Sequence, residues 1–452
     1  MNLRKLLTNE LNGRVWSIAL PLMLANSSIA LFGLIDAAVV GHLENASYLA
    51  GIALASVLFD FLYWGVTFLR MGTTGMVAQA SGAGDIGQCK QLLIESILVA
   101  LACAMLIIIF NDPIRHLGLS LLDGTRNANH QASIYFNIKI WGAPGVLATM
   151  VMMGWLIGMA EAKAVLAITA VTSLINAVLD ITLVFVFDLG VAGVGYAALA
   201  SAYAGALLGA TQCARVLRKQ NLGTRSFALQ LTRLKRFLSL NLNIFVRTLC
   251  LISAFALFTH FGAVQGDVVL AANALLLSFQ MLLALALDGY ANALELLVGE
   301  SIGRRDRSAF WHAVLIGTFW SGISAVMFSV FYFLVGTELI RLLTDLEQVR
   351  AAAVRYLPWM VLSPLVAVWC FVLDGIFIGA TQGRAMRNSM LFALIVVYIP
   401  ALILCERLGN HGIWAAFTAF FAARGLSMAW LFFQIDKRSG FIAAPEALKT
   451  VN

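Results

Sequence analysis

The chain has 452 residues, of which 61% are hydrophobic and only 12% are charged. A soluble domain carries roughly 25% charged residues, so this composition excludes an ordinary water-soluble protein and favours a membrane protein. The net charge of +7 follows from an uneven distribution of Lys and Arg among the loops, and it gives no reason to expect nucleic acid as a partner.

Apolar blocks of about 20 residues or more predict transmembrane helices, because a helix of that length crosses the hydrocarbon layer. We predict twelve of them, over residues 15–40, 48–80, 91–110, 132–160, 164–187, 191–214, 237–261, 268–302, 309–334, 354–381, 386–405 and 411–435. The basic stretch 215–236 separates the first six from the last six. We therefore predict an all-α polytopic membrane protein with an N-terminal lobe (1–214), a cytoplasmic basic linker (215–236) and a C-terminal lobe (237–452) that ends in a short tail.

The two halves are copies of one unit. Residues 41–85 match residues 262–306 with a constant shift of 221 positions. The same shift relates three later pairs, which are Tyr135 and Tyr356, Gly154 and Gly375, and Gly158 and Gly379. An even number of helices per repeat gives both lobes the same orientation. The expected fold is two pseudo-symmetric six-helix lobes around a central cleft, which is typical of transporters.

Lys and Arg predict the orientation, because cytoplasmic segments of membrane proteins carry more of them. With the N-terminus inside, cytoplasmic segments hold 20 of these residues and external segments hold 5. Both termini should therefore be cytoplasmic. The first apolar block contains Pro21 and Asp36 and lacks a cleavage site of small residues, so we interpret it as a retained helix rather than a signal peptide.

Ionisable side chains at bilayer depth are costly, so each requires a partner, a water-filled cavity or a function. Asp36 lies near the outer end of the first predicted helix, and Asp180 lies about 25 Å into the fifth. Thr172, Asn176 and Asp180 are spaced i, i+4, i+8 and share one helix face. Two neighbouring carboxylates in a low dielectric bind a proton or a cation, which predicts an ion-coupling site at Asp36, Asn176 and Asp180, with Thr172 as an auxiliary group. The alternative is a hydrogen-bonded cluster that only fixes packing.

The second half has no counterpart of this acidic site. The positions that correspond to Asp36, Asn176 and Asp180 are held by apolar residues, namely Leu257, Val397 and Ala401. The lobes are therefore expected to be similar in structure and different in chemistry, with ion coupling in the N-terminal lobe.

Several other residues are candidates for substrate or proton binding. Asp374 stands in the tenth predicted helix and corresponds to Met153 in the first half. We expect Asp374, Tyr63 and Met153 to contact substrate or a second proton, although Tyr63 and Met153 also suit positions against lipid or in the core. Arg247 and Asp288 are expected to form a buried ion pair.

Pro21 falls inside the first predicted helix, where proline bends a helix. A hinge at Pro21 would move Asp36. The sequence has no phosphate-binding loop, no zinc-protease motif and no nucleophile elbow, and its six histidines do not cluster. We therefore predict that the protein is not an enzyme and uses neither a cofactor nor a resident metal, and that an ion gradient supplies the energy.

Several segments together resemble the multidrug and toxic compound extrusion (MATE) family, over nearly the whole chain. They are Asp36–His42, Leu189–Gly193 and Asp374–Thr381. The stretch from Leu287 through Glu295 resembles the DinF-like branch of the family. The NorM-like branch carries an acidic residue in the seventh helix, and residues 237–261 contain none.

The resemblance implies a multi-pass protein of the cell inner (cytoplasmic) membrane that exports organic cations or amphipathic compounds by alternating access, against an inward flow of H⁺ or Na⁺. It also implies that Asp36, Asn176 and Asp180 bind the coupling ion. A Thr that completes the Na⁺ site in some relatives corresponds here to Ala198, and Ser201 is the nearest substitute. We therefore expect H⁺ rather than Na⁺, and we expect a monomer. The alternatives are a lipid-linked precursor flippase of similar architecture and, less favoured, a membrane-embedded enzyme.

Overall fold

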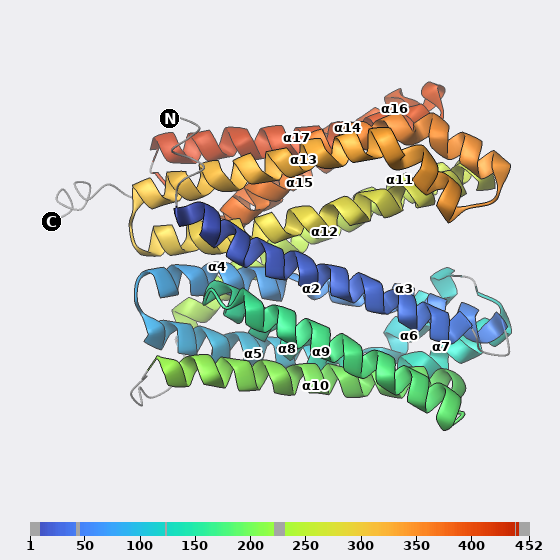
Figure 1. Ribbon diagram of the computed structural model, residues 1–452, viewed down its shortest axis with the longest axis horizontal. Coiled ribbons are helices and arrows are strands. Elements are labelled where there is room, and N and C mark those ends of the chain that lie inside the picture. Colours follow the sequence, from blue (N-terminus) through green and yellow to red (C-terminus); the bar gives the residue numbers. More distant parts are fainter. Residues whose placement is uncertain (1–9, 42–45, 123, 221–230, 439, 443–452) are drawn as a thin grey trace. The chain divides into compact units, whose positions relative to one another are not determined.

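The structure is a computed structural model that describes the chain apart from residues 1–9, 42–45, 123, 221–230, 439 and 443–452. The described residues are almost entirely helical and contain no strand (Figure 1). Some residues lie in a described helix while their side chains do not belong to the described part. Asp36 is one of them.

The described part of the first half of the chain folds into nine α-helices with two short irregular turns. The α-helices are α2 (Glu10–Gly41), α3 (Ala46–Val66), α4 (Phe68–Gly82), α5 (Ile86–Ile109), α6 (Asn111–Leu122), α7 (Arg126–Lys139), α8 (Ala143–Gly158), α9 (Ala162–Ile181) and α10 (Gly190–Lys219). A 3₁₀ turn, η1 (Ile140–Gly142), joins α7 to α8, and a π-helical turn, η2 (Thr182–Val186), follows α9.

The second half follows the same plan with longer helices. Its α-helices are α11 (Leu231–Val264), α12 (Asp267–Gly303), α13 (Arg307–Leu343), α14 (Glu347–Gly379), α15 (Gly383–Leu391), α16 (Ile399–Leu404) and α17 (Asn410–Arg438). The π-helical turn η3 (Phe392–Tyr398) joins α15 to α16, and the 3₁₀ turn η4 (Glu406–Leu408) precedes α17.

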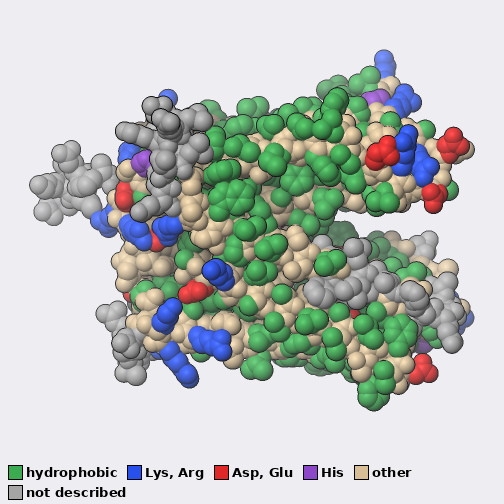
Figure 2. All heavy atoms as spheres, viewed as in Figure 1, with side chains coloured by type: hydrophobic (Ala, Val, Ile, Leu, Met, Phe, Trp, Pro, Cys, Tyr) green, Lys and Arg blue, Asp and Glu red, His purple; other side chains and the backbone are tan. Residues whose placement is uncertain are grey.

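Among the described residues, 11 helical segments are long and apolar enough to cross a bilayer. They correspond to the second to twelfth predicted spans, and α2 corresponds to the first. Hydrophobic side chains cover the middle of the helices on the face in Figure 2, and charged side chains gather towards the helix ends. The protein is therefore an all-α, multi-pass membrane protein, as predicted.

The duplication is visible in the turns between helices. Gly84 and Arg305 both have a left-handed backbone, with φ of 73° and 58°. Ala160 and Thr381 form a second such pair, with φ of 64° and 54°. Both pairs are separated by the 221 positions that the sequence comparison gives, so the two halves turn at equivalent residues.

One close contact between helices is also duplicated. A Cβ atom placed on Gly154 of α8 would lie 2.5 Å from the carbonyl oxygen of Arg70, and a Cβ on Gly375 of α14 would lie 2.4 Å from that of Ala291. Both distances are far below van der Waals contact, so only glycine allows these helices to approach so closely. These four residues form two pairs that again differ by 221 positions.

The chain divides into two compact units. The N-terminal unit comprises Pro21–Ser81 and Asp85–Phe237, and the C-terminal unit comprises Leu238–Asn452 together with Met1–Leu20 and Gly82–Gly84, as far as these ranges are described. The division falls inside α2, between Leu20 and Pro21. One continuous helix therefore contributes its first part to one unit and its second part to the other.

The first part of α2 packs within the C-terminal unit through polar and aromatic contacts. Arg14 Nη2 donates to Glu300 Oε2 over 2.7 Å. The Trp16 ring meets the rings of Tyr290 and Trp320 edge to face, with centroids 5.7 and 5.2 Å apart. These contacts fix the segment before Pro21 against α12 and α13.

Candidate functional site

The predicted polar face of α9 is present in the structure. Asp180 is completely buried, and Asn176 and Thr172 are half-buried on the preceding two turns. The Thr172 hydroxyl oxygen is buried and forms no hydrogen bond within the described part of the chain. An ionisable side chain and an unsatisfied hydroxyl thus lie along one face of a helix that is otherwise apolar.

Two glycines of α10 define how this helix packs against the end of α9. A Cβ on Gly205 would lie 3.3 Å from Thr172 Oγ1, and a Cβ on Gly193 would lie 3.1 Å from the backbone of Leu183. Adding the two residue numbers of each contact gives nearly the same sum for both contacts. A constant sum is expected for antiparallel helices packed side by side, because the numbering rises along one helix as it falls along the other. Residues between these two contacts can therefore be placed level with one another.

This register places Ser201 level with Asn176 and Ala198 close to the level of Asp180. Ser201 is buried, and its hydroxyl donates to the carbonyl oxygen of Ala198 over 3.0 Å. Its hydrogen is thus used within the helix, and only its oxygen is left for an ion. Close to the level of Asp180, α10 carries the methyl group of Ala198, which offers no side-chain oxygen to a cation.

The C-terminal end of α2 belongs to the same part of the N-terminal unit. Val39, Val184 and Val191 are buried in one hydrophobic cluster, and they come from α2, η2 and α10. Val39 follows Asp36 by three residues, and Val184 follows Asp180 by four. The backbone of Asp36 therefore lies about one turn from this cluster, although its side chain is outside the described residues.

Asp374 is held by two arginines. Its Oδ2 atom accepts hydrogen bonds from Nη2 of Arg247 on α11 and from Nη2 of Arg424 on α17, and all three side chains are buried. Arg247 therefore pairs with Asp374. The charge of Asp288 also acts on Arg247, and the pair expected between these two residues stays a prediction. The sequence showed Arg424 as an intramembrane charge without indicating a partner for it.

The remaining predicted residues lie on separate helices. Tyr63 is on α3, and its buried hydroxyl has no hydrogen-bond partner among the residues described. Its ring lies 5.6 Å from that of Phe59. Met153 is half-buried on α8. Pro21 is buried inside α2, where the division between the two units falls.

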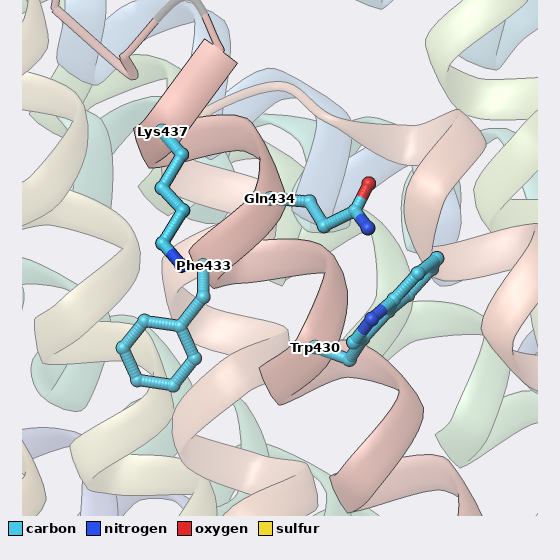
Figure 3. Close-up of a pocket in the computed structure, with 4 residues that line it drawn as sticks. All are labelled: Trp430, Phe433, Gln434 and Lys437. Carbon is cyan, nitrogen blue, oxygen red and sulfur yellow. The ribbon is translucent and has the colours of Figure 1, made fainter.

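Two open pockets lie on the C-terminal unit, at the ends of helices. One has a volume of about 270 Å³ and is lined by Trp430, Phe433, Gln434 and Lys437, which all come from α17 (Figure 3). The other, of about 430 Å³, includes Trp311 at the start of α13. Neither pocket contains a predicted site residue, and aromatic and basic side chains at helix ends are typical of the membrane interface.

The fold and the polar site define a polytopic transporter built from two repeats. The family model described as MatE matches the chain twice, over residues 21–182 and 243–404. The chain belongs to this MATE family, and it is a transporter-family protein rather than an enzyme.

Individual relatives agree with this assignment. The chain is 38% identical to the DNA damage-inducible protein F of Escherichia coli (strain K12), over 92% of this chain and 90% of that protein. It is 27% identical to a probable multidrug resistance protein NorM of Rhizobium meliloti, over 91% and 90%. A crystal structure of MATE in the bent conformation superimposes with a TM-score of 0.86 at 20% identity, over 96% of this chain and 97% of that one.

Proposed function

We propose that the protein is a multidrug antiporter that exports organic cations and amphipathic compounds by alternating access, driven by H⁺. The observation that supports this most strongly is a completely buried Asp180 on a polar helix face in a member of the MATE family. A buried carboxylate can bind and release a proton, and an intramembrane carboxylate is costly unless it has such a function. The protein acts as a monomer in the cytoplasmic membrane, with both termini inside.

Asp36, Asn176 and Asp180 form the coupling site in this proposal, with Thr172 and Ser201 as auxiliary groups. The coupling ion is H⁺ rather than Na⁺ because a cation shell requires several oxygen ligands, whereas a proton requires one carboxylate. The Ala198 side chain contributes no oxygen, and the Ser201 hydroxyl already donates within α10. These two residues therefore favour a proton over a sodium ion.

Pro21 is the hinge of the transport cycle in this proposal. Proline has no backbone N–H and cannot complete the hydrogen bond to the residue four positions before it, so α2 is weakest where the two units divide. A proton bound at Asp36 or Asp180 changes the hydrogen bonding beside the outer part of α2. In response, α2 bends at Pro21, and the part of α2 after Pro21 moves relative to the segment around Arg14, which is held in place.

The proposal is tested with purified protein reconstituted into vesicles that contain ethidium. An imposed pH gradient is expected to drive ethidium efflux, and an imposed Na⁺ gradient at constant pH is expected to leave it at the rate of protein-free vesicles. Efflux driven by Na⁺ alone would replace H⁺ as the coupling ion. If neither gradient drives efflux, the lipid-linked precursor flippase becomes the better explanation.

A second test addresses the hinge. Pro21→Ala restores the missing helix hydrogen bond, so the free energy of unfolding is expected to rise by about 1–3 kcal/mol. The restored hydrogen bond also makes bending of α2 more costly. We therefore expect pH-driven efflux to fall by about tenfold or more, since about 1.4 kcal/mol corresponds to a factor of ten. Thermal unfolding in detergent and vesicle efflux measure the two effects. Pro144→Ala is the matched control, because Pro144 stands at the start of α8, where proline is tolerated. Unchanged efflux in Pro21→Ala would remove the hinge from the mechanism.

A further inference from the structure

Helix α3 crosses the membrane, and one of its faces is exposed in the structure. The exposed residues described on α3 are Leu49, Ala50, Ala53, Val57, Asp60, Phe61 and Trp64. Their spacing follows the helical repeat, so they form one continuous stripe. The opposite side of α3 is buried in the core of the N-terminal unit.

Asp60 makes it energetically costly for this stripe to face lipid along its whole length. It lies in the span Ser47–Gly82, about 20 Å from the start of that span and about 33 Å from its end at 1.5 Å per residue. An exposed carboxylate at this depth is expensive in hydrocarbon, and such residues face water-filled spaces. The stripe around Asp60 therefore borders water inside the membrane.

The second repeat leaves the equivalent stripe exposed. The shift of 221 positions carries Val57, Asp60 and Phe61 onto Ser278, Met281 and Leu282 of α12, which are all exposed. Both repeats thus keep this face uncovered, which shows that it is a feature of the fold. Only the N-terminal unit places a carboxylate there.

A lysine lies behind the carboxylate. Lys139 Nζ donates to Tyr135 Oη over 2.9 Å and lies 4.8 Å from the centre of the Phe59 ring. Its charge acts on both Asp60 and Tyr63. Within the described chain the Lys139 ammonium is thus held by aromatic groups from α3 and α7, and it partly balances the charge of Asp60.

We infer that Asp60, Phe61 and Trp64 form the face that recognises the exported organic cation, and that Lys139 sets its affinity. This inference rests on the proposed function. A carboxylate beside two exposed aromatic rings attracts a flat cation through charge and through cation–π contact, which neither an anion nor a lipid tail would use. Lys139 and the exported cation are both positively charged, and both interact with the carboxylate of Asp60. A bound cation therefore replaces part of the electrostatic interaction between Asp60 and Lys139.

The test measures equilibrium binding of ethidium, rhodamine 6G and tetraphenylphosphonium to the purified protein in detergent, without any ion gradient. Asp60→Asn is expected to raise the dissociation constants by about tenfold, as for the loss of one partly desolvated charge pair. Phe61→Ala and Trp64→Ala should raise those of the flat dyes by about threefold. Lys139→Met should act in the opposite direction and lower them. Matched controls are Asp112→Asn, an exposed carboxylate paired with Arg115, and Trp141→Ala, an exposed aromatic residue of the same unit.

Opposite shifts in Asp60→Asn and Lys139→Met, with both controls unchanged, would support the recognition face, since a purely structural role predicts weaker binding in both. Wild-type affinity in Asp60→Asn, or no binding of any of the three cations by the wild-type protein, would overturn it. These outcomes are separate from those for coupling, because wild-type protein that binds the cations yet shows no gradient-driven efflux contradicts only the antiport proposal.

Discussion

Asp180→Asn is expected to reduce pH-driven efflux to the rate of vesicles without protein, and Asp36→Asn is expected to do the same. An amide keeps the size of the side chain and its capacity for hydrogen bonds, but it cannot take up a proton. Asp180 is completely buried on the polar face of α9, so no solvent-exposed group can replace it. The measurement is ethidium efflux under an imposed pH gradient.

Two further measurements separate a coupling role from a structural one. Exchange of labelled for unlabelled substrate at equal pH should persist in both variants, because exchange requires binding and movement without net proton transfer. Asp188→Asn is the matched control on the same helical hairpin. Asp188 is exposed and has a φ of 55°, a conformation that Asn also tolerates. Normal pH-driven efflux in Asp180→Asn would exclude Asp180 from the coupling site.

Asp374→Ala is expected to have the largest effect on stability, a loss of about 3–5 kcal/mol in the free energy of unfolding, which is typical of breaking a buried ion pair. The variant leaves the guanidinium groups of Arg247 and Arg424 buried without the carboxylate that they share. Unfolding in mixed detergent micelles measures the loss. Asp112→Asn, which breaks the more exposed pair with Arg115, should change stability by only about 0–1 kcal/mol.

The triple variant Asp374→Ala, Arg247→Met and Arg424→Met completes this experiment. It removes all three charges, so much of the lost stability should return, because buried ion pairs can often be replaced by apolar groups. A different result would follow if Asp374 carried protons or substrate. Asp374→Ala would then unfold like the wild-type protein and fail only in transport, and the structural role that the two arginines indicate would be wrong.

The sequence predicts the architecture well because the relevant patterns are local or periodic. Span length depends on consecutive apolar residues, and the shift of 221 positions needs only residue identity. The structure repeats two pairs of left-handed residues and one pair of close glycine contacts at that same shift. The burial of Asp180 and the shared face with Asn176 were likewise predictable, since both depend only on the helical repeat. Their role in coupling stays a prediction.

Partners of the buried charges were not predictable in the same way. Asp374 is 127 residues from Arg247 and 50 residues from Arg424, and a contact between them depends on how three helices are rotated against each other. Spacing along one helix contains no information about that rotation. Lys139 is a similar case, because its aromatic partner Phe59 comes from α3, far away in the sequence.

The position of the start of α2, around Asn12 and Arg14, has a consequence for biosynthesis. Arg14 pairs with a residue 286 positions later, and Asn12 accepts a hydrogen bond from Trp320, 308 positions later. At the usual translation rate of about 5–20 residues per second, the segment leaves the ribosome roughly 15–60 s before these partners exist. An early segment of the chain thus gains its partners among the last, and until then its polar residues must be kept without them.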